Sequence, residues 1–577
     1  MRKLLYSLLG IALLMPVRTE ACSNVIVTRG ASTDGSCMVS YAADSHLLYG
    51  ELYFHPRARY SEGTMLPVVE WDTYKPLGQI PQARRTWQTV GNMNEWQLII
   101  GETTWGGREE QMDTTGVMDY GSLIYIALQR ARTAREAIGV IVNLANKYGY
   151  ASEGETFSIA DPEEAWVMDL VGKGSGNRGI VWVARRIPDG YICAHANQAR
   201  ITRFPQDDPD NCIYAPDVIR YAREQGWYDG PDSEFSFRDA YNPLDFSGAR
   251  ACDARAWSAF NILGDGVFTY EENGVEVSRP ASDWLEYAMG HDLAGEMPLW
   301  IKPARKISPK DVADVMRDHY EGTPMDMRTD IGAGGNACPY RWRPMGFKWD
   351  GVEYVNERAI ATQQTGFWFV AQARGWLPRQ IGALVWFGCD DAATSYLTPI
   401  YVSTTKVPEC VRVGNGDMLH YSATSQFWMC NRVTNACYRM YNQMEPVVRA
   451  AADAFERDQM EVQTPRMDER MLKLASALQA DPSGRSLRAR IAARRIARRL
   501  TRYTVETAQS QFRAWAALEE MLTVKFIDGN VKAQEEDGSF RHSEYHEGTP
   551  AGMTQPGYTD KWKECVARDH GQTVRVR

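Results

Sequence analysis

The sequence predicts an α+β protein whose strands and helices form a layered sandwich, followed by a mainly helical C-terminal part. Short apolar and β-branched runs separated by turns occupy segments 24–41 and 155–196, and a helical pair lies between them. After about residue 425 the apolar residues recur at helical spacing instead. We therefore expect a core of residues 22–425 and a helical part of residues 426–577 packed on that core.

The first predicted element is a hairpin that begins next to Cys22. Residues 24–28 are mostly β-branched and predict a strand, residues 29–36 carry the turn formers Gly30 and Gly35, and residues 37–41 predict the returning strand. Asp44 follows at the far end of the second strand. Because the hairpin returns the chain toward its start, we expect Asp44 to lie beside Cys22.

The next elements are predicted from the same strand and helix patterns of apolar residues. Residues 92–104 predict a turn and a buried strand, residues 122–148 two amphipathic helices, and residues 155–196 four strands. Ser308, Pro309 and Asp311 form a helix start, with an N-cap, a proline at the first position and an acid at the third. Residues 380–388 predict another buried strand.

The C-terminal third predicts helices at 428–457, 467–480 and 485–502, and the last of these is rich in arginine. In a chain of net charge -9 we interpret the basic helix as a solvated face, because nucleic-acid partners require a basic surface overall. The polar last thirty residues predict a tail or a surface wrap. No nucleic-acid partner and no cofactor are predicted. No membrane span is predicted, since no later apolar run is long enough to span a bilayer. No metal is predicted, since no C-x-x-C pair or histidine cluster occurs.

Residues 1–21 have the pattern of a secretory signal. Arg2 and Lys3 are basic, residues 4–15 are apolar, and Thr19 and Ala21 are small residues at positions -3 and -1 of a cleavage site before Cys22. This predicts an exported protein, periplasmic or secreted. The alternative is a lipoprotein in which Cys22 is acylated. Lipoprotein signals favour Leu at position -3, where this chain has Thr19.

Cleavage before Cys22 would create a complete nucleophilic unit. One residue would then carry a thiol, with an ordinary pKa of about 8.5, and a free α-amine, with one of about 7.7 to 8.0. A proton can pass between them at little cost near neutral pH, so the amine can activate the thiol as a general base. Asp44 would orient the amine.

Several stretches in order resemble the secreted dipeptidases of the dipeptidase A type. These are N-terminal-nucleophile hydrolases related to penicillin V acylase and bile salt hydrolase. The likeness covers most of the chain after residue 21, and its stretches are 22–27, 31–36, 93–98, 101–104, 155–162, 164–167, 196–198, 210–215, 317–323 and 386–392.

The resemblance implies a four-layer αββα sandwich and a set of site residues. Cys22 matches the nucleophile, Asn94 in Met-Asn-Glu an oxyanion-hole residue, and Asn197 in Ala-Asn-Gln a second site Asn. Asp44 matches the Asp after the hairpin, and Arg255 a late active-site Arg. The chain departs from the pattern at Tyr41, near which relatives often carry an Arg beside the thiol.

The sequence therefore predicts an exported dipeptidase that hydrolyses the amide bond of dipeptides, with Cys22 as nucleophile and its α-amine as base. The alternatives are an acylase of the bile salt or penicillin V class and, from another class, a binding lipoprotein. The predicted partner is a small peptide substrate, and a homo-oligomer stays open.

Overall fold

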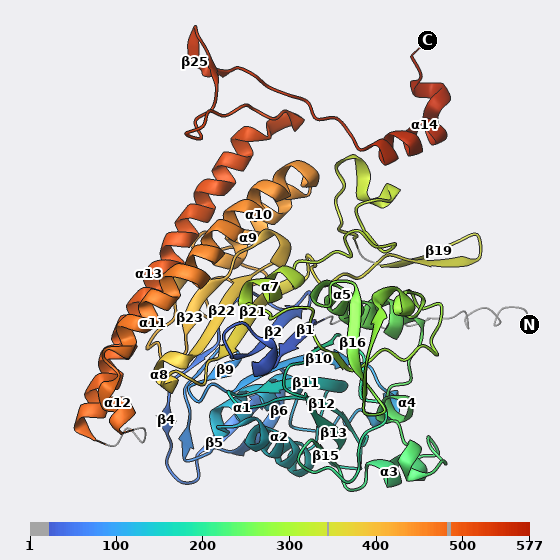
Figure 1. Ribbon diagram of the computed structural model, residues 1–577, viewed down its shortest axis with the longest axis vertical. Coiled ribbons are helices and arrows are strands. Elements are labelled where there is room, and N and C mark those ends of the chain that lie inside the picture. The colour runs from blue at the N-terminus through green and yellow to red at the C-terminus, as the bar shows by residue number, and fades with distance from the viewer. Residues whose placement is uncertain (1–21, 343–344, 482–485, 577) are drawn as a thin grey trace, which may run out of the picture.

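The computed structural model describes residues 22–342, 345–481 and 486–576, and it confirms the α+β class (Figure 1). The predicted signal segment 1–21 lies outside the described residues. Two large antiparallel sheets form the centre of the molecule, one of seven strands and one of eight. Helices cover them, and a long helical segment follows in the C-terminal third.

The predicted hairpin is confirmed at the centre of the seven-stranded sheet. Strand β1 pairs antiparallel with β2, with Ile26 opposite Val39. The sheet has the order β18-β14-β1-β2-β21-β22-β23. Its strands are β1 (Asn24–Val27), β2 (Cys37–Asp44), β14 (Ile192–His195), β18 (Trp300–Ile301), β21 (Thr365–Ala373), β22 (Ala383–Cys389) and β23 (Thr398–Tyr401). Strand β21, which the sequence analysis missed, is buried at every residue.

The eight-stranded sheet has the order β15-β13-β12-β11-β10-β9-β8-β3. Its strands are β3 (Phe54–His55), β8 (Thr89–Val90), β9 (Met93–Asn94), β10 (Ile99–Trp105), β11 (Gly154–Ala160), β12 (Ala165–Gly172), β13 (Ile180–Arg186) and β15 (Cys212–Tyr214). The predicted helical pair is α1 (Tyr120–Arg130) and α2 (Ala134–Tyr148), and it packs on this sheet.

The two sheets contact each other through β2, which touches both β10 and β11. Helices α5 (Ala254–Leu263) and α7 (Pro309–Val315) pack on the other face of the seven-stranded sheet. Strand alternation separates the two faces: Val25 and Val27 join the core under α5 and α7, whereas Ile26 joins the core between the sheets. Cys22 joins the core between the sheets as well.

Smaller elements surround the sheets. The hairpins are β4 (Ala58–Arg59) with β7 (Arg85–Thr86), β5 (Met65–Val69) with β6 (Pro76–Pro81), β16 (Val267–Glu272) with β17 (Val275–Pro280), β19 (Gly346–Trp349) with β20 (Val352–Val355), and β24 (His542–Ser543) with β25 (His546–Pro550). The short helices are α3 (Val218–Glu224), α4 (Phe237–Tyr241), α6 (Leu285–Ala288) and α8 (Arg379–Gly382).

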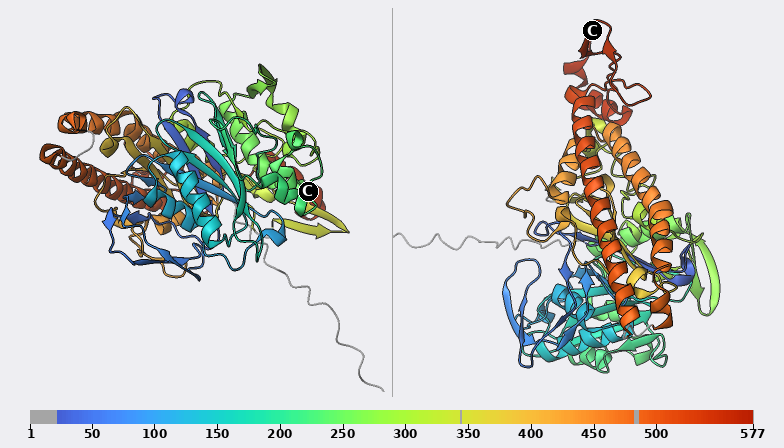
Figure 2. Two further views of the ribbon diagram at one scale, coloured as in Figure 1. Left: turned by 90° about the horizontal axis from the view of Figure 1, so that it is seen from below. Right: turned by 90° about the vertical axis from the view of Figure 1, so that its left-hand side faces the viewer.

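The C-terminal third is mainly helical, as the amphipathic pattern predicts. Its helices are α9 (Gln426–Cys437), α10 (Tyr441–Arg457), α11 (Thr464–Leu472), α12 (Ser476–Ala480), α13 (Leu487–Lys525) and α14 (Asp560–Val574). Helix α13 packs along β23, and Figure 2 shows it extending past the sheets. None of the helices in the described part of the chain has the length and apolarity needed to cross a membrane.

A buried ion pair joins α10 to the segment after α7. Arg317 Nη1 lies 3.0 Å from Glu456 Oε2, and the two side chains are 1% and 0% exposed. Removing the guanidinium leaves a buried carboxylate whose remaining cation, Lys310, is 3.8 Å away. An unpaired buried charge lowers the free energy of unfolding, so breaking this pair is costly. The pair therefore helps to hold the helical part on the core.

We predict that Arg317→Met lowers the free energy of unfolding by about 3 to 5 kcal/mol, because Glu456 loses its buried partner. The measurement is the midpoint of denaturant unfolding. Arg305→Met is the control, because its ion pair with Asp311 is exposed on the arginine side, and it should cost about 1 kcal/mol or less. Equal shifts for the two variants would contradict the prediction.

Candidate active site

The thiol of Cys22 points into the core between the two sheets. Its side chain is buried, with 4% exposed, because Cys22 shares a strand face with Ile26. The Cys22 Sγ atom lies 3.4 Å from Oε1 of Glu102 and 3.7 Å from the hydroxyl of Tyr41. Tyr41 belongs to β2 and Glu102 to β10, so the two sheets meet at this sulfur atom.

Glu102 is a site residue that the sequence analysis missed. It is fully buried and accepts a hydrogen bond from the Tyr41 hydroxyl, and the neighbouring side chain of Glu155 lowers its pKa. Burial raises the pKa of Glu102, and the negative charge of Asp72 raises it further. A carboxylate within a strand predicted to be buried is the signal that could have identified it.

The surroundings of Cys22 favour the protonated thiol in this chain. Burial raises the pKa of Cys22 well above its ordinary value, and the negative charges of Glu102 and Asp44 raise it further. The Asp44 backbone and the contact with the Tyr41 hydroxyl lower the pKa of Cys22. A positive charge close to the sulfur atom would be needed to produce a thiolate near neutral pH.

Asp44 ends strand β2 beside Cys22, as the hairpin predicts. Its carboxylate accepts hydrogen bonds from Thr365 Oγ1 at 2.6 Å and from Arg358 Nη2 at 2.7 Å. Burial raises the pKa of Asp44, and the charge of Arg358 opposes that shift. Arg358 therefore places a guanidinium beside the Asp44 carboxylate. Sequence reasoning missed it because Arg358 is remote along the chain.

Arg255 holds the backbone of Cys22. It lies on α5, and its Nη1 atom donates to the carbonyl oxygen of Cys22 at 2.7 Å and to Ser23 Oγ at 2.9 Å. Its Nη2 atom donates to Asn197 Oδ1 at 2.8 Å. Asn197 has a φ of 48°, and its amide nitrogen donates to the carbonyl of Thr104. The structure therefore brings four predicted site residues together: Cys22, Asp44, Asn197 and Arg255.

Asn94 is the last residue of β9, and its side-chain hydrogen bonds go to residues outside this group. Its Nδ2 atom donates to the carbonyls of Leu128 and Ala131 at 2.7 and 2.9 Å, so it closes the C-terminal end of α1. Its Oδ1 atom accepts from the backbone of Trp96 at 2.8 Å. These bonds give Asn94 a structural role in this chain, and its part in an oxyanion hole stays a prediction.

His195 does not form a dyad with Cys22. Its two ring nitrogens bond to Thr103 Oγ1 at 2.7 Å and to Ser158 Oγ at 2.6 Å. Burial and the neighbouring arginines lower its pKa to about 3, so the ring is neutral. Within residues 22–342, 345–481 and 486–576, no cluster of three His, Cys, Asp or Glu residues could hold a metal ion.

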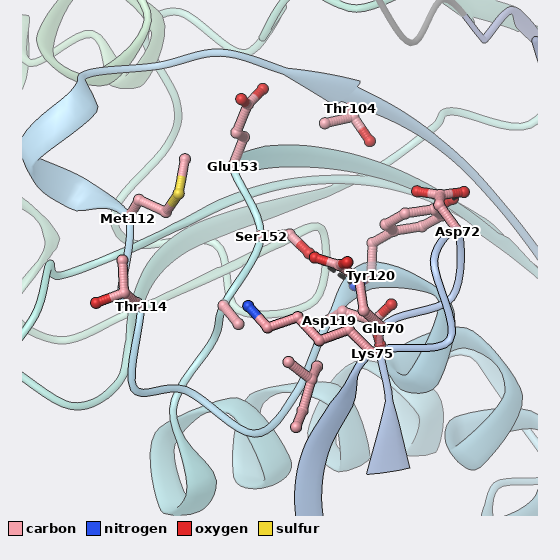
Figure 3. A pocket seen from close by; sticks show the side chains of 12 residues that line it. Glu70, Asp72, Lys75, Thr104, Met112, Thr114, Asp119, Tyr120, Ser152 and Glu153 are labelled. Atoms are coloured by element: carbon pink, nitrogen blue, oxygen red, sulfur yellow. Dashed lines mark hydrogen bonds between the residues drawn. The ribbon is translucent and has the colours of Figure 1, made fainter. Parts of the chain in front are cut away.

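An acidic pocket lies next to this site (Figure 3). It has a volume of about 310 Å³, and its lining includes Glu70, Asp72, Asp119 and Glu153, with Lys75 as a basic group. Thr104 lines the pocket and donates to Glu155 Oε2 at 3.1 Å, and Glu155 in turn lowers the pKa of Glu102. The pocket is therefore connected through Thr104 and Glu155 to the carboxylate that contacts Cys22.

Comparison with known proteins gives the class of the chain. The model of peptidase family C69 matches residues 21–454, and its first matched residue immediately precedes Cys22. Because this match covers most of the chain, the protein belongs to peptidase family C69.

Curated relatives carry dipeptidase names. The chain is 23% identical over 419 residues to the "Probable dipeptidase" of Salmonella dublin, a match that covers 69% of this chain and 84% of the relative. It is 23% identical over 466 residues to "Dipeptidase A" of Lactobacillus helveticus, covering 76% and 86%. It is 22% identical over 431 residues to "Probable dipeptidase B" of Lactococcus lactis, covering 71% and 80%.

We predict that Glu102→Gln lowers the pKa of the Cys22 thiol in the chain that still carries residues 1–21, because the substitution removes a negative charge that raises it. The measurement is the rate of alkylation of Cys22 by iodoacetamide as a function of pH, followed by peptide mass spectrometry. The midpoint should move to lower pH. Cys252 is the control in the same sample, since Glu102 is not among the groups that shift its pKa. An unchanged midpoint at Cys22 would contradict the prediction.

Proposed function

We propose that this protein is an exported dipeptidase that uses Cys22 as an N-terminal nucleophile. The observation that carries the proposal is the position of the Cys22 thiol, buried between two sheets against Glu102, with its carbonyl held by Arg255. The family match that begins at residue 21 and the dipeptidase names of the relatives support it. The two sheets with their helices are, in this proposal, the αββα sandwich of the N-terminal-nucleophile hydrolases, with residues 22–425 as core and 426–577 as a helical part packed on it.

Removal of residues 1–21 would change the charge at the nucleophile. It converts the backbone nitrogen of Cys22 into an α-amine, which is cationic when protonated. An ammonium group beside the sulfur offsets the carboxylates of Asp44 and Glu102, which raise the thiol pKa. Signal cleavage would then be the activating step, because only the free amine can take the proton of the thiol.

The reaction would run in two halves. The amine takes the proton of Cys22 Sγ, and the sulfur attacks the peptide carbonyl carbon to form a tetrahedral adduct. The ammonium returns a proton to the leaving nitrogen as the C–N bond breaks, which leaves a thioester and a free amino acid. Water, deprotonated by the same amine, attacks the thioester, and the released thiol regains a proton.

Oxyanion stabilisation is assigned here by resemblance. Asn197 is the proposed amide, and a donor of this kind contributes about 3 to 4 kcal/mol to the transition state. Asn94 is the other residue that the resemblance offers, but both hydrogens of its Nδ2 atom are donated to the carbonyls of Leu128 and Ala131. Asn197 is bonded to Arg255, which holds Cys22. This shared guanidinium supports a position for Asn197 close to the reacting carbon.

The acidic pocket supports a dipeptide substrate over the acylase alternative. A dipeptide carries a free α-ammonium group, which the carboxylates of Asp72 and Glu153 would attract. Conjugated bile salts and penicillin V carry an anionic group and no ammonium group, so the carboxylates of the pocket would repel their charge without a compensating attraction.

We predict that Cys22→Ser lowers kcat/KM on a dipeptide panel by at least about 10³-fold, because the thiol is the proposed nucleophile. The mass of the purified wild-type N-terminus is measured in parallel and should correspond to an unmodified chain beginning at Cys22. The uncleaved chain should be inactive. Full activity of the Ser variant would contradict the mechanism, and a diacylglyceryl group on Cys22 would favour the lipoprotein.

We predict that Asp72→Asn raises KM for dipeptides about tenfold and changes kcat less, because it weakens attraction for the substrate ammonium without touching the nucleophile. Steady-state kinetics on one dipeptide and on its N-acetylated form measure the effect. The acetylated form lacks the ammonium and should be a poor substrate for both proteins. An equal KM in both proteins for the free dipeptide would contradict the role of the pocket.

A further inference from the structure

A second groove, larger than the acidic pocket, has seven arginines in its lining. It has a volume of about 970 Å³ and lies between the β4–β7 region, helix α8 and the N-terminal half of α13 (Figure 1). We call it the arginine groove. Arg57, Arg59, Arg85 and Arg132 line one side, Arg379 of α8 lies beside them, and the two arginines of α13 complete the lining.

The two arginines of α13 explain part of the basic helix seen in the sequence. Arg490 and Arg494 are spaced by four residues, which puts them on the same helix face, and both are exposed. On sequence alone, the basic helix is interpreted as a solvated face. Arg490 and Arg494 also line the arginine groove, which that interpretation does not include.

The positive charge of the groove is not balanced by its own acids. Glu95 is the single carboxylate in its lining, and it binds Arg57 Nε and Arg379 Nη1, each at 2.8 Å. The other five arginines of the groove have no ion-pair partner in the described part of the chain.

Several of these charges also repel one another. Arg59 and Arg85 stand directly opposite each other in the β4–β7 pair, an arrangement that destabilises a strand pair when the charges are alike. Burial and the charges of Arg57 and Arg59 lower the pKa of Arg85. This arrangement costs folding energy unless an anion occupies the groove.

Two tryptophans hold the guanidinium groups in place. Arg85 stacks over the ring of Trp87 at 4.5 Å and Arg379 over that of Trp96 at 4.2 Å. Arg132 lies about midway, 4.9 Å from the first ring and 5.0 Å from the second. Stacking fixes the planar groups without consuming their N–H donors, so those donors remain available to a ligand.

The groove is separate from the candidate active site. In the pairing of β2 with β21, Asp44 is opposite Thr365 and Cys37 is opposite Ala373. Arg379 follows the Ala373 end of β21, whereas Cys22 lies beside Asp44. Strand β21 has nine residues, which span about 26 Å. The groove therefore lies at the opposite end of the seven-stranded sheet from the thiol.

We propose that the arginine groove binds a compact anion carrying several phosphate groups. Phosphate matches the fork geometry of arginine and carries up to two charges per group, so a few phosphates can neutralise the groove. A long nucleic acid is disfavoured because it would extend past the groove over a chain of net charge -9, and because arginines already cover the Trp87 and Trp96 rings that bases would need.

The test is titration calorimetry of the full chain with inorganic tripolyphosphate at 150 mM salt. The groove variant combines Arg59→Gln, Arg85→Gln and Arg494→Gln. The matched control combines Arg495→Gln, Arg498→Gln and Arg499→Gln, which removes the same charge from exposed positions of α13 outside the groove. We expect micromolar binding to the wild type, a loss of about tenfold or more in the groove variant, and a change below about threefold in the control.

Flotation with vesicles that contain phosphatidylinositol 4,5-bisphosphate identifies the source of the phosphates. Vesicle binding that the groove variant loses assigns the groove to a lipid headgroup, and binding of tripolyphosphate alone assigns it to a soluble polyphosphate. The proposal is overturned if neither tripolyphosphate nor the vesicles bind, or if the control variant weakens binding as much as the groove variant does. It is also overturned if a 20-nucleotide RNA binds more tightly than tripolyphosphate and loses its affinity in the groove variant. Dipeptide hydrolysis by the groove variant should equal that of the wild type, which keeps this test independent of the proposed function.

Discussion

The contact between the Cys22 thiol and the Glu102 carboxyl is the interaction on which the rest of the site depends. The two residues come from different sheets, so they meet only when β1 and β2 pack against β10. Both groups are buried, and burial raises the pKa of each. Protonation of one or both relieves the cost of burying like charges side by side.

A set of buried arginines compensates the carboxylates around this contact. Arg358 binds Asp44, and Arg255 binds the backbone carbonyl of Cys22 and the side chain of Asn197. Burial and the charge of Arg358 lower the pKa of Arg255. A network of this kind fixes the position of Cys22 because each hydrogen bond restricts a different atom near it.

Charge is distributed unevenly over the rest of the molecule. The pocket beside Thr104 is rich in carboxylates, whereas the groove next to α8 and α13 is rich in arginine. The net charge of -9 averages over these two surfaces and describes neither of them. The charge that a ligand meets at each surface is therefore the local one, because salt at physiological concentration screens a charge in water beyond about 8 Å.

The sequence by itself determined the local elements. The β-branched run after Cys22, the turn and the returning strand defined the hairpin, and the helical pair and the N-cap at Ser308 were equally visible, because these patterns depend on neighbours along the chain. Only the tertiary structure decided which distant side chains surround the thiol. Glu102 and Arg358 come from a remote strand and a remote loop, and Asn94 binds the carbonyls that end α1. The physical reason is that strand periodicity sets which face a residue points to, whereas the packing of one sheet on another sets what that face meets.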